Sequence, residues 1–231
     1  MHTDYVRSLA SDSETFARSL EQNPQLGRVI SGDADWGQYV RFLSASYHYV
    51  RWSGFLLART ADGLRRSKRC PQLLVALDAK AQEEGPHDLW LLRDLRNLGV
   101  NVELLKGAPA AKAIEAYVAW SSTFAEAGSP AFLGAAYTLE FISMRCATTA
   151  CRNLRARKAI PNVEHALRFL EGHGVADHGH IAELEAVLDA VPDATDQAEI
   201  AFSASVMRAL YPSFFAAQAW GGSHVELQRC A

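Results

Sequence analysis

Apolar residues recur at the period of an α-helix along almost the whole chain, and strand signals are scarce. In the first such segment, Tyr5, Leu9, Phe16 and Leu20 lie near one face of a helix. Similar patterns predict further helices over about residues 24–30, 35–60, 73–98, 109–124, 130–157, 161–191 and 195–220. Because the connections are short, the sequence predicts an all-α fold: one domain over residues 1–231, a bundle of seven to eight helices, with residues 222–231 as a loose tail.

The segment over residues 169–184 places three potential metal ligands on one stripe of its helix. At about 100° per residue, Asp177 lies about 40° and His180 about 20° from His173. Apolar neighbours indicate that this stripe faces inward, where imidazoles and a carboxylate are costly to bury unless something satisfies them. A divalent metal ion would do so. His178 lies about 140° from His173, so we expect it on the solvent side.

A second group of donors lies within residues 80–95. Glu84 precedes His87 by three residues and Glu83 precedes it by four, and either spacing puts the carboxylate on the face of the imidazole. Glu-x-x-His is the pattern that di-iron carboxylate bundles repeat. A solvated acidic face is the alternative interpretation. Pro86 interrupts the helix, so we expect a bend or local unwinding there.

Glu140 lies within an otherwise apolar helical stretch, residues 131–144. A helix that is apolar nearly all round favours burial of this carboxylate. Pairing with an arginine or a tyrosine would be the structural explanation, and metal ligation the functional one. The complete candidate set, from three helices, is Glu84, His87, Glu140, His173, Asp177 and His180. Mixed carboxylate and imidazole donors suit iron or manganese, and they leave coordination positions for O2 and substrate.

The three segments containing these residues read EEGPHDLWLLRDL, LEFISM and FLEGHGVADHGHIAEL. In this order they resemble the heme-oxygenase-like di-iron oxidases and oxygenases, which include the CADD-type proteins and the fatty-acid decarboxylase that forms terminal alkenes. The resemblance implies the helical bundle shared with heme oxygenase, the TenA thiaminases and the pyrroloquinoline quinone synthase PqqC. It also implies two iron ions, or manganese in one site, joined by a carboxylate bridge, with O2 as co-substrate.

Residue by residue, the resemblance places the ligands at the six candidates above, with Glu83 in reserve for Glu84. It predicts a homodimer that oxidises a small amino acid, amine or carboxylic acid in a biosynthetic pathway. The substrate pocket should be lined by the helix predicted over residues 35–60, which is rich in aromatic residues, and by the last helix, residues 195–220. The candidate lining residues, each of which could instead belong to the core, are Tyr47, Trp52, Tyr137, Met207 and Phe215. Arg51 or Arg208 could bind a substrate carboxylate, or lie at the surface.

Three other functions compete with this hypothesis. A metal-free enzyme of the same fold could be a TenA-like hydrolase with Cys146 as nucleophile, or a PqqC-like oxidase without a cofactor. A heme-binding protein or heme oxygenase would need a proximal histidine near the first helix, where His2 is the candidate. A non-catalytic helical interaction module would use the histidines as core residues.

Composition excludes several other classes. The 231 residues are 49% hydrophobic and 21% charged with a net charge of −3, which argues against nucleic acid as a partner. The cysteines form no Cys-x-x-Cys pair, so a disulfide framework is not expected. An apolar run of about 18 residues and the apolar core of a signal peptide are both missing from the sequence. We therefore expect a soluble, cytoplasmic protein without a membrane partner.

Overall fold

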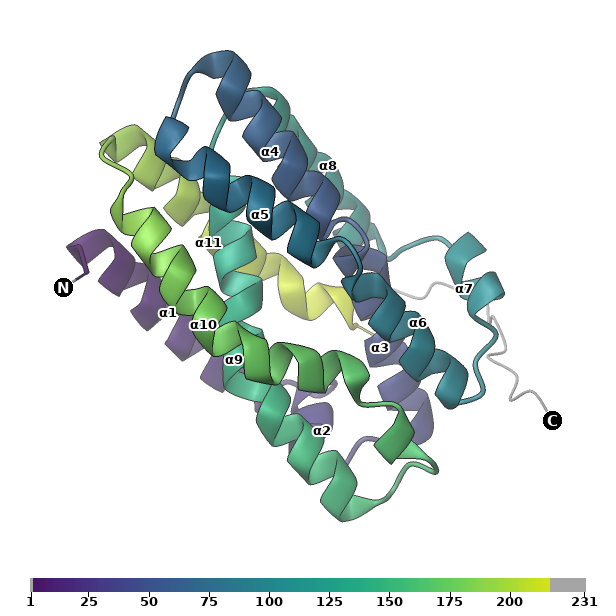
Figure 1. The fold of residues 1–231 in the computed structure, drawn as a ribbon. Coiled ribbons are helices and arrows are strands. Elements are labelled where there is room, and N and C mark those ends of the chain that lie inside the picture. The colour runs from purple at the N-terminus through teal and green to yellow at the C-terminus, as the bar shows by residue number, and fades with distance from the viewer. Residues whose placement is uncertain (1, 217–231) are drawn as a thin grey trace.

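The computed structural model describes the backbone of residues 2–216 and the side chains of residues 2–174 and 179–216. Throughout this part of the chain the regular elements are helices, which confirms the all-α prediction (Figure 1). They are α1 (Asp4–Leu20), α2 (Leu26–Ser31), α3 (Trp36–Val50), α4 (Ser53–Ser67), α5 (Leu74–Glu84), α6 (His87–Asn97), α7 (Val102–Gly107), α8 (Lys112–Glu126), α9 (Phe132–Arg157), α10 (Arg168–Asp189) and α11 (Ala194–Phe214). The tail predicted to be loose, residues 222–231, lies outside the described residues.

The single helix predicted over residues 35–60 is two helices, α3 and α4. The chain turns at Arg51 and Trp52, whose ψ angles are −13° and −11°. The turn lets the start of α4 pack closely on the end of α5, since a Cβ on Gly54 would lie 2.8 Å from the carbonyl oxygen of Ala81. Arg51 and Trp52 are neither proline nor glycine, and the Ser53-Gly54 that follows them is a weak turn signal that lies within α4.

The helix predicted over residues 73–98 is also divided, and here the reason is visible in the local sequence. Pro86 has no backbone N–H to continue a helix, and it lies between the last residue of α5 and His87, the first residue of α6. The bend expected at Pro86 is confirmed as a complete break. The short helix α7 was not predicted. It begins where the side chain of Asn101 accepts a hydrogen bond from the backbone N–H of Glu103, at 3.1 Å.

Helix α9 is the centre of the bundle. It packs against α1, α2, α10 and α11, and Figure 1 shows it running behind α10. Close approach to α11 depends on Gly134, because a Cβ there would overlap the backbone of Ile200. The first half of α9 is buried on nearly every side, as its apolar sequence predicts.

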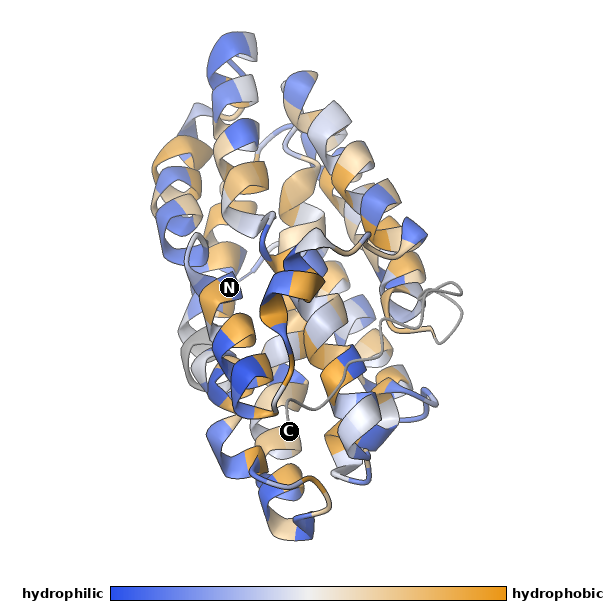
Figure 2. Ribbon diagram, turned by 90° about the vertical axis from the view of Figure 1, so that its right-hand side faces the viewer, coloured by the Kyte–Doolittle hydropathy of each residue, from blue (hydrophilic) through white to orange (hydrophobic). Residues whose placement is uncertain are grey.

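Many of the other helices are amphipathic. In Figure 2, hydrophilic and hydrophobic residues lie on opposite sides of individual helices, as expected of helices that bury one face against a common core. In the described part of the chain, no helix is long and apolar enough to cross a membrane.

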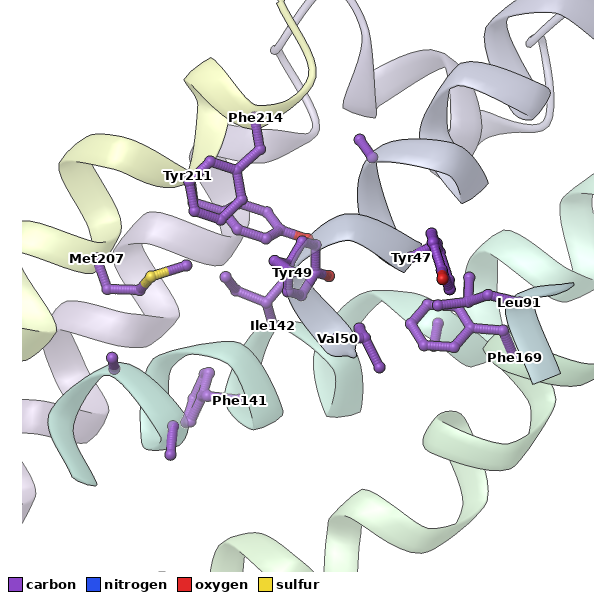
Figure 3. Close-up of a cluster of buried hydrophobic side chains, with 14 of the residues drawn as sticks. Tyr47, Tyr49, Val50, Leu91, Phe141, Ile142, Phe169, Met207, Tyr211 and Phe214 are labelled. Atoms are coloured by element: carbon purple, nitrogen blue, oxygen red, sulfur yellow. The ribbon is translucent and has the colours of Figure 1, made fainter. Parts of the chain in front are cut away.

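Helix α3 separates two groups of aromatic side chains (Figure 3). Tyr49 lies with Tyr211 and Phe214 of α11, at ring-centroid distances of 6.2 and 5.5 Å. Tyr47, two residues earlier, lies instead beside Leu91 and Phe169. Residues two apart differ by about 200° around a helix, so the two tyrosines serve different parts of the core.

Candidate metal centre

The break between α5 and α6 brings the first two predicted ligands together. Glu84 ends α5 and His87 begins α6, and both side chains are buried. His87 Nδ1 lies 3.2 Å from Glu84 Oε2. Burial alone would raise the pKa of Glu84, but the contact with His87 and the nearby His173 and Lys80 outweigh it and lower that pKa. Glu84 is therefore a buried carboxylate in its ionised form.

Helix α10 brings His173 to the same place. Its ring lies 4.9 Å from that of His87, nearly perpendicular to it, and 4.7 Å from that of Phe169. Trp90 stacks on His87, the other predicted ligand, with 4.1 Å between the two ring centroids. These contacts fix the orientation of both imidazoles, as second-shell groups do for metal ligands.

Glycines on both sides of His173 allow this approach. A Cβ on Gly172 would lie 2.5 Å from the ring of Trp90, and one on Gly174 would lie 2.6 Å from the hydroxyl of Thr148. The Gly-His-Gly sequence thus lets α10 pack against α6 and α9 at the level of the ligand. Without a side chain at these two positions, the imidazole can enter the cluster between the helices.

Asp94 of α6 sets the start of α10. Its carboxylate accepts hydrogen bonds from the backbone N–H groups of Arg168, at 3.1 Å, and Phe169, at 2.8 Å. It therefore satisfies two of the donors that a helix N-terminus leaves open. Burial raises the pKa of Asp94 to about 6, although both backbone hydrogen bonds act in the opposite direction. The helix bearing His87 is in this way tied to the helix bearing His173.

Glu140 of α9 joins the cluster together with a residue that the sequence analysis missed. Lys80, one turn before Glu84 on α5, places its Nζ 3.1 Å from Glu140 Oε1 and 3.9 Å from Glu84 Oε1. Burial lowers the pKa of this amine, but Glu140, Glu84 and Glu83 more than offset it, so the pKa lies above its ordinary value. A lysine four residues before a glutamate usually forms a surface pair, so the spacing alone does not indicate a buried lysine.

The choice between Glu83 and Glu84 is partly resolved by burial. Glu84 is buried beside His87, whereas the side chain of Glu83 is 39% exposed. Glu83 nevertheless contacts the cluster, because its Oε1 lies 2.5 Å from His180 Nε2. His180 is half-buried, and its Nδ1 lies 3.9 Å from Glu140 Oε2. Both glutamates are therefore within reach of the predicted centre, on different sides of it.

For two residues of α10 with a predicted position, the structure gives no side-chain geometry. Asp177, predicted as a ligand, and His178, predicted to face solvent, have side chains outside the described residues. Among the side chains that are described, no three His, Cys, Asp or Glu residues are arranged to hold one metal ion as they stand. The donor types nevertheless suit iron, since buried carboxylate and imidazole groups converge from α5, α6, α9 and α10.

An apolar cavity of about 100 Å³ opens on the cluster. Glu84, Glu140 and His173 line it at one place, and residues of α1, α2, α3, α4, α8, α9, α10 and α11 form the rest. Polar atoms in the wall come from Tyr49 and Tyr211, among others. Burial raises the pKa of both phenols, so they stay neutral. Among the described residues of the wall, none is a lysine or an arginine.

The six residues predicted to contact substrate do not line this cavity. Tyr47, Tyr137, Met207 and Phe215 are buried in the core, and the hydroxyl of Tyr137 lies 2.9 Å from Glu185. Arg51 is exposed and lies over the rings of Tyr47 and Trp52. The described lining contains instead other members of the same helices, Tyr49 and Val50 of α3 and Tyr211 of α11. The cavity is therefore lined by both of the predicted helices, but by residues on them other than the six candidates.

Arg208, the other candidate for a substrate carboxylate, forms an ion pair with Asp12 at 3.1 Å. His2, the candidate proximal ligand for heme, lies at the surface, where its Nδ1 is 2.5 Å from Asp189. Cys146, the candidate nucleophile, does line the cavity. Burial raises the pKa of its thiol to about 11, which disfavours the reactive thiolate.

The fold described above is the heme-oxygenase-like bundle. It is similar to the crystal structure of a domain of unknown function with a heme oxygenase-like fold from Shewanella denitrificans, with a TM-score of 0.79, 18% identity, and 93% of this chain and 91% of that chain covered. It is also similar to a TenA homolog from Pseudomonas syringae pv. tomato, with a TM-score of 0.74, 15% identity, and 93% and 92% covered. At these identities the likeness defines the fold and not the activity.

The class of protein follows from the sequence of residues 40–211, which match the family of iron-containing redox enzymes. The chain belongs to this family. The matched residues contain all six predicted ligands. No curated protein matches the chain. The predicted resemblance is thus confirmed for the fold and for iron-dependent redox chemistry, whereas a specific likeness to the CADD-type or alkene-forming enzymes stays a prediction.

Proposed function

We propose that this protein is a non-heme iron oxidase or oxygenase that uses O2 to oxidise a small molecule. One observation carries the proposal: buried Glu84, His87, Glu140 and His173 converge where an apolar cavity meets them. Glu84, His87 and His173 would hold iron, with Asp177 as a further ligand predicted from the sequence. The bound iron would supply the redox chemistry for O2 activation, with the substrate as a source of electrons.

The cavity supports a substrate with an apolar body. Most of its wall is aliphatic or aromatic, so a hydrocarbon group would replace little bound water and lose few hydrogen bonds. Its volume of about 100 Å³ suits a short chain or a single ring better than a long one. Because the described wall has no lysine or arginine, the polar group of a substrate would be oriented at the end where Glu84, Glu140 and His173 lie. Among the predicted substrates, we favour carboxylic acids and amines with a compact apolar group.

The protein's own residues would orient the substrate and exclude water. The neutral hydroxyls of Tyr49 and Tyr211 hydrogen-bond to each other and are polar groups in a mostly apolar wall. The apolar surround separates the reacting end of the substrate from bulk solvent, which favours controlled oxidation over side reactions.

The test combines metal binding with turnover. The protein is loaded anaerobically with Fe(II), its iron content is measured, and O2 uptake is recorded with a panel of carboxylic acids, amines and amino acids. His173→Ala and Glu84→Gln should lose iron and substrate-dependent O2 uptake. His165→Ala, at an exposed histidine, is the matched control and should retain both. Substrate-dependent turnover by iron-free protein would refute the proposal.

A metal-free TenA-like hydrolase is the second candidate, favoured by Cys146 in the cavity wall and by the fold shared with a TenA homolog. The raised pKa of the Cys146 thiol counts against it, since a nucleophilic cysteine needs a lowered one. Hydrolysis that requires no metal and stops after treatment with iodoacetamide would establish this alternative.

A further inference from the structure

The two oxygens of the Glu84 carboxylate face two different partners. Oε2 lies 3.2 Å from His87 Nδ1, whereas Oε1 lies 3.9 Å from Lys80 Nζ. A carboxylate that bridges two metal ions likewise directs one oxygen to each ion. On one side of Glu84 are the imidazoles of His87 and His173, and on the other side is an ammonium group.

The ammonium of Lys80 has the surroundings of a bound cation. Besides Glu84, its Nζ contacts Glu140 Oε1 at 3.1 Å and Glu83 Oε2 at 3.4 Å. The side chain is only 10% exposed, so the amine lies among the carboxylates and does not extend into solvent as lysines usually do. His180 completes this side of the cluster through its contacts with Glu83 and Glu140.

A metal ion on this side would compete with the ammonium for the same oxygens. Metal–carboxylate bonds are about 2 Å long, so an ion bound to Glu84 Oε1 and Glu140 Oε1 would occupy the place that Lys80 Nζ now takes. Two cations cannot share it without strong repulsion in a buried site. One ammonium and one divalent ion together balance the charge of the three described carboxylates, Glu83, Glu84 and Glu140.

We propose that Lys80 is a built-in cation that replaces the second metal ion, so that the chain binds one iron, at Glu84, His87 and His173. This inference rests on the proposed function, because it specifies the metal content of the same centre. It replaces the pair of ions that the sequence predicts by one iron and one lysine. Glu83 and Glu140 then bind the ammonium, and His180, which contacts both of these carboxylates, helps to fix their position beside the iron.

The test is the metal stoichiometry of the full chain. Wild type, Lys80→Glu and Lys80→Met are dialysed anaerobically against Fe(II) and, separately, against redox-inactive Zn(II), and the metal is counted per chain. Wild type should bind one ion, and Lys80→Glu, which supplies a carboxylate where the ammonium was, should bind two. Lys112→Glu, at a side chain that is 92% exposed, is the matched charge control and should bind one.

After oxidation, wild type should give the EPR signal of an isolated high-spin ferric ion. In Lys80→Glu this signal should be lost through coupling between two ferric ions. If Lys80→Glu does not fold, Lys80→Met, which keeps the length of the side chain without its charge, should bind more than one ion at saturation. Two ions in wild type, or one ion in the folded Lys80 variants, would overturn the inference and leave the proposed function intact. No bound iron in wild type would refute the proposed function itself.

Discussion

The packing of α9 against α11 can be tested with a pair of glycine substitutions. Gly134 is the point of closest approach, where an added Cβ would overlap the Ile200 carbonyl oxygen and lie 2.9 Å from its carbonyl carbon. Carbon atoms in contact are about 3.5–4.0 Å apart, so Gly134→Ala must separate the two helices by on the order of 1 Å. The obstacle is backbone, which cannot move aside as the end of a flexible side chain can.

The expected loss follows from two opposing effects. Overpacking a core costs about 1–3 kcal/mol, and sometimes more when the backbone must move. Replacing a helical glycine with alanine recovers about 1 kcal/mol through helix propensity. Because the clash involves the backbone of both helices, we expect the overpacking effect to exceed its usual range, and a net loss of about 2–3 kcal/mol. For a chain of this size the melting temperature should fall by about 6–9 °C.

Gly179→Ala is the matched control. Gly179 also lies within a helix, but an added Cβ there would meet nothing within 4 Å. This variant gains the helix propensity without the clash, so its melting temperature should stay equal or rise. Thermal unfolding followed by circular dichroism measures both variants. The reasoning is refuted if Gly134→Ala is as stable as wild type, or if the two substitutions have the same effect.

Three more residues at or near the candidate site carry predictions: Asp94, Cys146 and Ala136. Asp94→Ala removes the cap of α10 and should lower the free energy of unfolding in urea by about 2–4 kcal/mol, whereas exposed Asp62→Ala should change it by less than about 0.5 kcal/mol. The folded-state pKa of Asp94, about 6, lies above its ordinary 3.8. The folded chain therefore retains a proton that the unfolded chain releases, so the Asp94 contribution should decline as pH rises from about 4 to about 6. An identical pH slope in Asp94→Ala would contradict this. Cys146→Ser should retain turnover, and iodoacetamide should modify native Cys146 far more slowly than an unfolded cysteine; inactivation of the variant would show that the thiol is required. Ala136→Phe, one turn before Glu140 in the cavity wall, should raise the substrate KM or abolish turnover while iron content stays constant; unchanged kinetics would place the substrate elsewhere.

The break at Pro86 illustrates what local sequence can determine. Proline removes a backbone donor wherever it occurs, so the interruption between α5 and α6 was predictable without any knowledge of the neighbouring helices. The turn at Arg51 and Trp52 was not, because it depends on the packing of α4 against α5. A helix boundary that depends on a local residue such as proline could be predicted from the sequence. A boundary that depends on the packing of other helices could not.

In the candidate site, too, some features could be predicted from local spacing and others depend on helix packing. Helical spacing predicted that Glu84 and His87 come together and that His173 points inward. Both contacts are present, although Glu84 ends α5 and His87 begins α6. The resemblance predicted that the helix containing α3 lines the pocket, with Tyr47 as a candidate, whereas Tyr49, about 200° around the helix, lines the cavity wall. The face that a fully buried helix presents to a cavity depends on its partners, and the pattern of such a helix is apolar on all sides.

The sequence by itself determined the all-α class, the positions of most helices and the types of donor that the centre contains. These follow from hydrophobic period, proline chemistry and ligand spacing, which act over a few residues. Only the tertiary structure decided which charges meet. Lys80 lies on α5 and Glu140 on α9, far apart in the chain. Their ion pair forms because the packing of the helices buries the amine beside the carboxylate. In the one-iron proposal, this long-range contact decides whether the same donors bind one metal ion or two.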